Sequence, residues 1–287
     1  MIKEFAVEPA AIVDSYRDFC YVTEKFGISE GRVISQYPSK WKKMVYEAAQ
    51  ARHAGTVEYA RFVERLKNMP TDLLMPFSRP GGNGNTPWVT QALAEHARLP
   101  FDYLLTQEVE DLPLVVKVSD IDGEHACFTP SRQLRIRREA NEMADACNLL
   151  LRSATRIKLI DPYFDFLHER FRAPFFEFIE RLRPNTVVEI FRNDSVATDE
   201  LRRRGSRYLP ERLPRSIRVC MHVWTQDVMH NRYLMSNHGG AIFGVGLDAA
   251  EDEAAREDEV TIMQKDIWLA TWDKYSNTQA IAEWIRT

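Results

Sequence analysis

A histidine and an arginine stand two residues apart in the last quarter of the sequence, and this pair is the strongest candidate for chemistry. His230 and Arg232 fall on a predicted strand, where residues i and i+2 point to the same face. An imidazole beside a guanidinium suits phosphate, because arginine donates two parallel hydrogen bonds to its oxygens. Asn237 follows past a predicted bend, and Gly244 and Gly246 allow close backbone approach on the next predicted strand. The pattern predicts a phosphate-facing site.

The spacing His230-x-Arg232-x4-Asn237 resembles the H-x-K-x4-D motif of the phospholipase D superfamily, with Arg in place of Lys and Asn in place of Asp. More narrowly, residues 155–250 are similar to the MIT C-terminal domain, a phospholipase-D-like domain, and the resemblance extends over residues 135–287. The matching pieces are, in order, Asp161-Pro162-Tyr163 at the end of a predicted strand, His230-x-Arg232, the Asn237–Gly240 turn and Gly244-x-Gly246-Leu247-Asp248. The resemblance implies that Asp161, Tyr163, Gly244, Gly246 and Asp248 shape the pocket.

The resemblance also implies a mechanism that needs neither a metal nor a cofactor. In active members two motifs meet; one histidine attacks phosphorus and the other protonates the leaving group. The resemblance implies that the catalytic residues here are His230, Arg232 and Asn237. The sequence holds one full motif, so an active enzyme requires two chains to pair. The pocket of the MIT C-terminal domain is non-catalytic and binds phosphoinositides or partners, so we expect a degenerate pocket without turnover.

A second candidate binding feature is a run of arginines. Residues 202–218 contain seven arginines and one glutamate, and arginine is the better phosphate ligand of the two basic residues. The predicted contacts to nucleic acid or another polyanion are Arg202, Arg203, Arg204, Arg207 and Arg215, with Tyr208 available for stacking. The alternative is a solvated face or a protein contact. Residues 248–259 carry seven acids and one arginine, and we expect a solvated loop or partner surface there rather than a metal site.

The amino-acid composition limits the classes of function that the chain can have. The 287 residues are 45% hydrophobic and 28% charged, as in a soluble globular protein. The net charge of -4 excludes a uniformly basic nucleic-acid binder, but it hides the arginine run. No two of the four cysteines have C-x-x-C spacing, so neither a disulfide framework nor a cysteine zinc site is expected. The sequence has no long apolar run and no signal-like N-terminus, and we expect a cytoplasmic protein.

Hydrophobic patterning predicts an α/β protein in two parts. Residues 1–130 are predicted to form a mainly helical N-terminal module, and residues 131–287 a phospholipase-D-like mixed β-sheet flanked by helices. Helices are expected over 135–152 and 266–285. The glycine-rich stretch 79–86 predicts a surface loop, in preference to a phosphate cradle at Gly82-Asn83-Gly84.

Three functions remain open at this stage. The leading hypothesis is an accessory protein that binds nucleic acid or another phosphate-bearing ligand through a degenerate pocket; analogy with the superfamily suggests bacterial defence or DNA handling. The second is an active, metal-independent homodimeric phosphodiesterase or nuclease with a phosphohistidine intermediate. The third is a non-catalytic scaffold that binds protein partners through the N-terminal module and residues 248–259.

Overall fold

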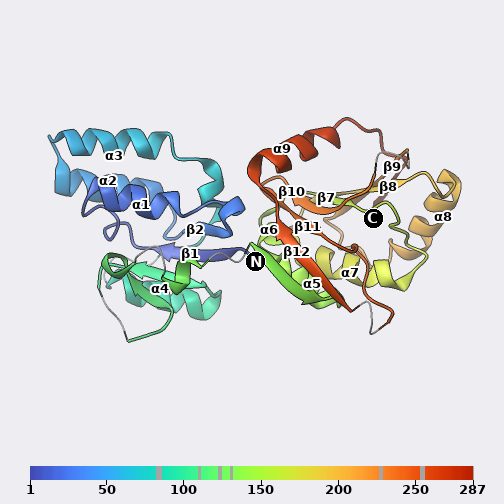
Figure 1. The fold of residues 1–287 in the computed structure, drawn as a ribbon, viewed down its shortest axis with the longest axis horizontal. Helices are drawn as coiled ribbons and strands as arrows, with labels where there is room; N and C mark the ends of the chain where they lie inside the picture. The colour runs from blue at the N-terminus through green and yellow to red at the C-terminus, as the bar shows by residue number, and fades with distance from the viewer. Residues whose placement is uncertain are drawn as a thin grey trace. The chain divides into compact units, whose positions relative to one another are not determined.

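The computed structural model describes residues 1–81, 86–108, 111–121, 125–129, 132–225, 229–252 and 256–286. The chain divides into two compact units, Ile2–Ser131 and Arg132–Thr287, the latter joined by Met1 (Figure 1). Each unit combines a β-sheet with helices, which confirms the predicted α/β class.

The first unit is built on a five-stranded parallel sheet with strand order β3-β2-β1-β4-β5. The strands are β1 (Lys3–Val7), β2 (Arg32–Gln36), β3 (Leu74–Ser78), β4 (Tyr103–Thr106) and β5 (Val115–Lys117). The module predicted to be mainly helical therefore also contains a parallel sheet that the prediction left out. Strands of a parallel sheet are covered on both faces, so they lack the polar–apolar alternation that reveals a strand in sequence. Consecutive residues Phe5, Ala6 and Val7 are all fully buried.

Helices cover both faces of this sheet. Phe5 and Val7 belong to a core with side chains of α1 (Tyr16–Glu24), α2 (Trp41–His53) and α3 (Val57–Lys67), whereas Ala6 packs with α4 (Trp88–Arg98). Short 3-10 helices lie at Ile28–Glu30, Thr71–Leu73, Val118–Asp120 and Ala126–Phe128. The chain steps outward from β1 to β3 and then crosses back to β4, which is the doubly wound topology.

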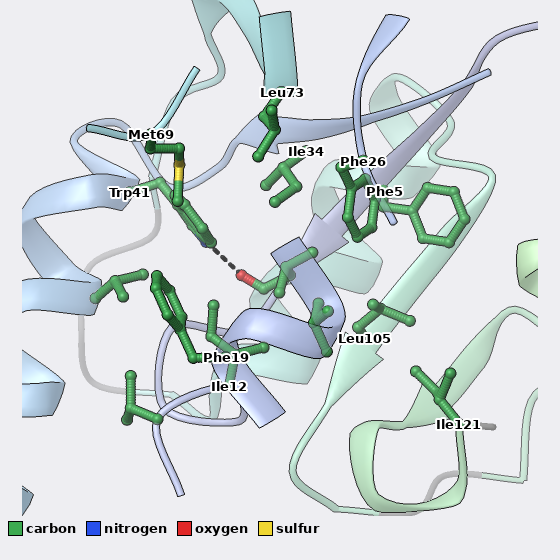
Figure 2. Close-up of a cluster of buried hydrophobic side chains, with 14 of the residues drawn as sticks. Phe5, Ile12, Phe19, Phe26, Ile34, Trp41, Met69, Leu73, Leu105 and Ile121 are labelled. Carbon is green, nitrogen blue, oxygen red and sulfur yellow. Dashed lines mark hydrogen bonds between the residues drawn. The ribbon is translucent and has the colours of Figure 1, made fainter. Parts of the chain in front are cut away.

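Trp41 fixes the end of the central strand in this core. Its indole N–H donates a hydrogen bond of 2.6 Å to the carbonyl oxygen of Val7 (Figure 2). The side chain is fully buried and lies among the apolar residues of the larger core. Helix α2 is thus tied to β1 by a polar contact as well as by packing.

The second unit holds an eight-stranded mixed sheet of order β13-β9-β8-β7-β10-β11-β12-β6. Strands β7, β8 and β9 run parallel, and the other pairs are antiparallel. The strands are β6 (Gln133–Arg137), β7 (Arg156–Ile160), β8 (Val187–Asn193), β9 (Arg218–Trp224), β10 (Arg232–Ser236), β11 (Gly239–Phe243), β12 (Glu257–Ile262) and β13 (Ala282–Ile285).

Two predicted helices of this unit are partly strands. The expected helix over 135–152 begins with β6, and α5 (Ala140–Ala146) and α6 (Asn148–Ser153) follow it. The expected helix over 266–285 begins with α9 (Lys265–Lys274), and its last residues form β13. Both strands pair at sheet edges, where their few apolar residues fit either periodicity.

The remaining helices of the unit are α7 (Glu169–Glu180) and α8 (Thr198–Tyr208). Helix α9 lies on the opposite face of the sheet from α5 and α7 (Figure 1). Lys158 on β7 holds the carboxyl end of α9. Its fully buried ammonium donates hydrogen bonds to the carbonyl oxygen of Trp272 and to the hydroxyl of Ser276, each at 2.8 Å.

Replacing Trp41 with Phe removes the donor to Val7 and leaves that buried carbonyl without its partner. We expect the free energy of unfolding of the first unit to fall by about 2–4 kcal/mol, from the lost hydrogen bond and the smaller side chain. Chemical denaturation followed by far-UV circular dichroism measures the loss. Val57→Ala, at a 74% exposed position of the same unit, is the control and should change stability by less than about 0.5 kcal/mol. Equal losses of stability in Trp41→Phe and Val57→Ala would contradict the role assigned to the Trp41 hydrogen bond.

Burial lowers the pKa of the Lys158 ammonium from 10.5 to about 8. Between these values the unfolded chain holds the proton and the folded chain has lost it, so stability should rise with pH. From pH 7.5 to pH 10 we expect the free energy of unfolding to rise by about 2 kcal/mol more in wild type than in Lys158→Met. Lys43→Met, at an exposed lysine, should keep the wild-type slope. If the stability of Lys158→Met rose with pH as steeply as that of wild type, the rise could not be assigned to Lys158.

Candidate functional site

Three segments meet at the carboxyl end of β7. Asp161 directly follows this strand, Arg232 begins β10, and the loop Gly244–Asp248 follows β11. Because β10 runs antiparallel to β7 with Tyr233 opposite Ile160, the register places Asp161 beside Arg232. Asp161 also contacts the loop through a hydrogen bond. The fold therefore brings together the predicted residues Asp161, Tyr163, Arg232, Gly246 and Asp248.

Asp161 is a buried clamp between two backbone segments. Only 2% exposed, it accepts the N–H of Tyr163 through Oδ1 and the N–H of Leu247 through Oδ2, both at 2.9 Å. Burial raises the pKa of this carboxyl, and the two backbone hydrogen bonds and the nearby charge of Arg232 partly offset the rise. Both oxygens are committed to the main chain, so Asp161 positions the site.

A second buried carboxylate holds the other side of the same loop. Asp258 is 3% exposed, and its Oδ1 accepts the N–H of Val245 at 3.0 Å and that of Glu259 at 2.7 Å. Burial raises the pKa of Asp258, and these backbone hydrogen bonds lower it in part. The loop Gly244–Asp248 is therefore fixed at both ends by carboxylates from neighbouring segments.

The glycines of this loop leave room for those carboxylates. A Cβ on Gly246 would lie 2.3 Å from Oδ1 of Asp248 and 3.5 Å from Oδ2 of Asp161, and a Cβ on Gly244 would lie 2.9 Å from Oδ1 of Asp258. Asp248 itself accepts a hydrogen bond of 2.7 Å from Arg138 and lies 3.7 Å from Arg170. The predicted close backbone approach is found, and its partner is a set of carboxylates.

Arg232 is the cation of the site. Its Nη1 donates to the carbonyl oxygen of His230 at 3.0 Å, and its guanidinium lies 5.6 Å from the ring centre of Tyr163, which is 55% exposed. Its Nε is buried and has no hydrogen-bond partner in the part of the chain that the structure describes. The side chain as a whole is only half-buried, so its amino groups keep capacity for an acceptor that comes from outside.

His230 lies just before β10 rather than on it. Strand pairing begins at Arg232, opposite Phe243, so the predicted common face of His230 and Arg232 is not formed by the sheet. The imidazole is exposed and makes no hydrogen bond with any described residue. Its backbone carbonyl, by contrast, holds the arginine.

Asn237 lies at the opposite end of β10, and the structure does not bring it to the site. Its Oδ1 accepts the N–H groups of Thr155 and Arg156 at 2.9 and 3.1 Å, and its Nδ2 contacts His238 at 2.9 Å. Asn237 therefore shapes the entry into β7. A five-residue strand separates it from His230, so it cannot orient that imidazole.

The arginine run is mostly consumed by ion pairs within the unit. On α8, the first two arginines bond the first-turn acids, Arg202 with Asp199 and Arg203 with Glu200. Arg204 bonds Glu200 and the buried Asp165. Three of the five arginines predicted to contact a polyanion are thus engaged in ion pairs, because acids three and four residues earlier on the helix face them.

The rest of the run is spread out. Arg212 stacks 3.8 Å from the ring centre of Phe176, and Arg218 lies 3.4 Å from Glu283. Arg207 and Arg215 are exposed and form no ion pair with a described residue. The ring of Tyr208 is covered by the guanidinium of Arg172 at 4.2 Å, with that of Arg207 at 5.4 Å.

Sequence reasoning missed several charged residues around the site. The buried Arg192 at the end of β8 lies 3.6 Å from Asp165, which also holds Arg204. Arg138 and Arg170 partner Asp248. An arginine at the end of an apolar strand was the signal for Arg192, whereas Arg138 and Arg170 are recognisable only from the tertiary pairing.

The acidic segment is also paired in part. Asp248 and Glu251 contact Arg170, and Arg135 lies 3.9 Å from Glu257 and 3.2 Å from Glu259. Residues 253–255 lie outside the described residues, as does the predicted loop Gly82-Asn83-Gly84. The described part of the chain contains no group of three metal-ligating side chains. It also contains no helix that is long and apolar enough to cross a membrane.

Comparison with known proteins adds no family. No family model and no curated protein matches the chain. Among solved structures, TrmBL2, an archaeal chromatin protein with a novel mode of DNA binding, is 14% identical over 54% of this chain and 53% of its own, with a TM-score of 0.28. Polyphosphate kinase from Porphyromonas gingivalis is 13% identical over 83% and 44%, with a TM-score of 0.31. The chain thus spans about half the length of these proteins, and TM-scores of this size do not establish a shared fold.

Gly246→Ala tests the clamped loop. The added Cβ would overlap Asp248 and crowd Asp161, so we expect a loss of about 1–3 kcal/mol in the free energy of unfolding of the second unit. Thermal and chemical denaturation measure it. Val245→Ala is the matched control, because Val245 is 48% exposed in the same loop and should change stability by less than about 0.5 kcal/mol. An unaffected Gly246→Ala protein would show that the loop is free to move.

Proposed function

We propose that the second unit is a phospholipase-D-like domain that binds a phosphate-bearing ligand, with nucleic acid as the preferred class, through Arg232 and the neighbouring His230. The observation that carries this proposal is the state of the Arg232 guanidinium. It donates one hydrogen bond within the described chain, to a neutral carbonyl, and its buried Nε has no partner there. Phosphate oxygens are suited to such a planar set of donors.

The surroundings of Arg232 support this ligand class. Asp161 is near enough for the charge of Arg232 to lower its pKa, but both of its oxygens accept backbone N–H groups, and no salt bridge joins it to the arginine in the described chain. The exposed ring of Tyr163 beside the guanidinium offers a stacking surface for a base or a sugar. A cation and an aromatic ring together are typical of nucleic-acid contacts.

Binding without turnover is the better supported form of this function. A histidine nucleophile is usually activated by a hydrogen-bonded partner, and His230 has none among the described residues, while Asn237 is engaged at the far end of β10. Each chain also supplies a single motif. The exposed imidazole favours the homodimeric phosphodiesterase as the second candidate, because two copies can meet only if the histidine is accessible.

Arg232→Gln should weaken binding to a fluorescent 20-nucleotide single strand of DNA or RNA at least tenfold at low salt in EDTA, because it removes the phosphate-facing charge. Fluorescence anisotropy measures the affinity, with a duplex of the same sequence and phosphoinositide vesicles as comparison ligands. Arg286→Gln is the matched control, since it removes one exposed charge from the same unit outside the arginine run and should change the affinity less than twofold. Equal weakening by both changes would mean diffuse electrostatic attraction rather than a site.

His230→Ala separates binding from catalysis. If the protein is an accessory binder, wild type and His230→Ala leave the labelled strand intact after prolonged incubation in EDTA. Cleavage by wild type that disappears in His230→Ala would establish the phosphodiesterase instead. Cleavage that persists in His230→Ala would remove His230 from the chemistry altogether.

A further inference from the structure

The first unit has a cavity of its own at the carboxyl edge of its parallel sheet. The cavity measures about 420 Å³, within the range of small-molecule sites. It lies where β2 and β3 end and α4 begins, and it is lined by Tyr37, Gly81, Thr86, Thr90, Gln91 and Glu95. In open α/β sheets, ligands bind beyond the carboxyl ends of the strands.

Tyr37 is the buried polar group of this cavity. The residue is 1% exposed, and its ring is fixed against Trp88 and Phe101 at 5.9 and 5.6 Å between ring centres. Its hydroxyl makes no hydrogen bond with any residue that the structure describes. Burial and the nearby Glu95 raise the pKa of this hydroxyl, so it stays protonated and can both donate and accept. Because Tyr37 lines the cavity, its hydroxyl is available there as both a donor and an acceptor.

The α4 side of the cavity adds further hydrogen-bonding groups that are not used within the described chain. Thr86 and Thr90 are exposed, and their hydroxyls form no hydrogen bond with a described residue. Gln91 donates through Nε2 to the carbonyl of Thr86 at 2.6 Å, which orients its carboxamide and leaves Oε1 available as an acceptor. Pro80 and Ala94 complete the lining with apolar surface. Hydroxyls, an oriented amide and an apolar wall match a sugar joined to a base.

The charges of the lining argue against a phosphate group. Glu95 is the one ionisable acid among the lining residues, and it is held by Arg98 at 2.6 Å and by the buried Arg79 at 3.5 Å. No lysine, arginine or histidine lines the cavity in the described chain. An anion placed there would meet a carboxylate without a free cation to balance it.

The usual nucleotide position of a doubly wound sheet lacks its glycine-rich phosphate-binding turn here. Between β1 and β4, Glu8 accepts the N–H of Gln107 at 2.7 Å, and Ile12 and Val13 of the following segment are buried in the core. The turn after β1 contains no glycine to approach a pyrophosphate. The cavity of this unit lies instead beside α4.

We propose that this cavity binds an uncharged nucleoside, with its ribose at the hydroxyls of Tyr37 and Thr90 and its base edge at the carboxamide of Gln91. The site is independent of Arg232 and belongs to the other unit. The first unit thus recognises a nucleoside by hydrogen bonding, whereas the function proposed above depends on positive charge.

Calorimetric titration of the full chain with adenosine and with uridine tests the proposal. At least one of them should bind with a Kd of about 1 mM or tighter, and adenosine monophosphate should bind at least tenfold more weakly. Thr90→Val and Tyr37→Phe each remove one hydroxyl at nearly constant volume and should weaken binding about tenfold. The proposal would be overturned if neither nucleoside bound at about 10 mM, or if the monophosphate bound more tightly than the nucleoside.

A steric pair locates the site on α4. Ala94→Phe places a ring in the cavity and should abolish nucleoside binding, whereas Ala97→Phe, at an exposed position of the same helix outside the lining, should leave the Kd unchanged. Binding that survives Ala94→Phe would place the ligand elsewhere. Arg232→Gln should bind the nucleoside as wild type does, even if it loses affinity for nucleic acid. Nucleoside binding therefore tests the cavity, and nucleic-acid binding tests the site at Arg232.

Discussion

Two buried carboxylates, Asp161 and Asp258, determine the geometry of the second unit's candidate site. Each accepts backbone N–H groups from the loop Gly244–Asp248, and each is too buried to be solvated by water. These main-chain hydrogen bonds resist movement of the loop, because moving it would leave the accepting oxygens without partners. Asp161 therefore holds the loop and the turn at Tyr163 together.

This use of carboxylates has an electrostatic consequence for Arg232. A buried Asp beside an Arg normally forms a salt bridge, and such a bridge would neutralise the arginine. Here backbone N–H groups donate to the Asp161 carboxylate, and the guanidinium of Arg232 contacts a neutral carbonyl and an aromatic ring. On α8 the opposite holds, since the first-turn acids neutralise the arginines that follow. Local sequence density of arginine is thus a poor guide to free positive charge.

Much of the second unit was predictable, because its central elements carry strong local signals. The apolar strands around Ile157 and Val188, the helix at Thr198 and the close approach at Gly246 all follow from residue type and spacing. Asn237 was misplaced because spacing along a strand says nothing about which end faces the site. The first unit's sheet was missed because strands buried on both faces lack alternation, as at Phe5–Val7.

The edge strand β6 has a consequence for how the second unit assembles. It is the first strand of the unit, yet it pairs only with β12, and its Gln133 reaches Glu259 across 126 residues of sequence. Closing so long a loop costs chain entropy before any contact between these strands compensates for it, and contacts of this kind slow folding. The parallel core of β7, β8 and β9 is far more local, so it is expected to form first. Strand β6 then remains an unpaired edge until β12 is in place, and this interval is when the unit is most exposed to strand exchange with a second molecule.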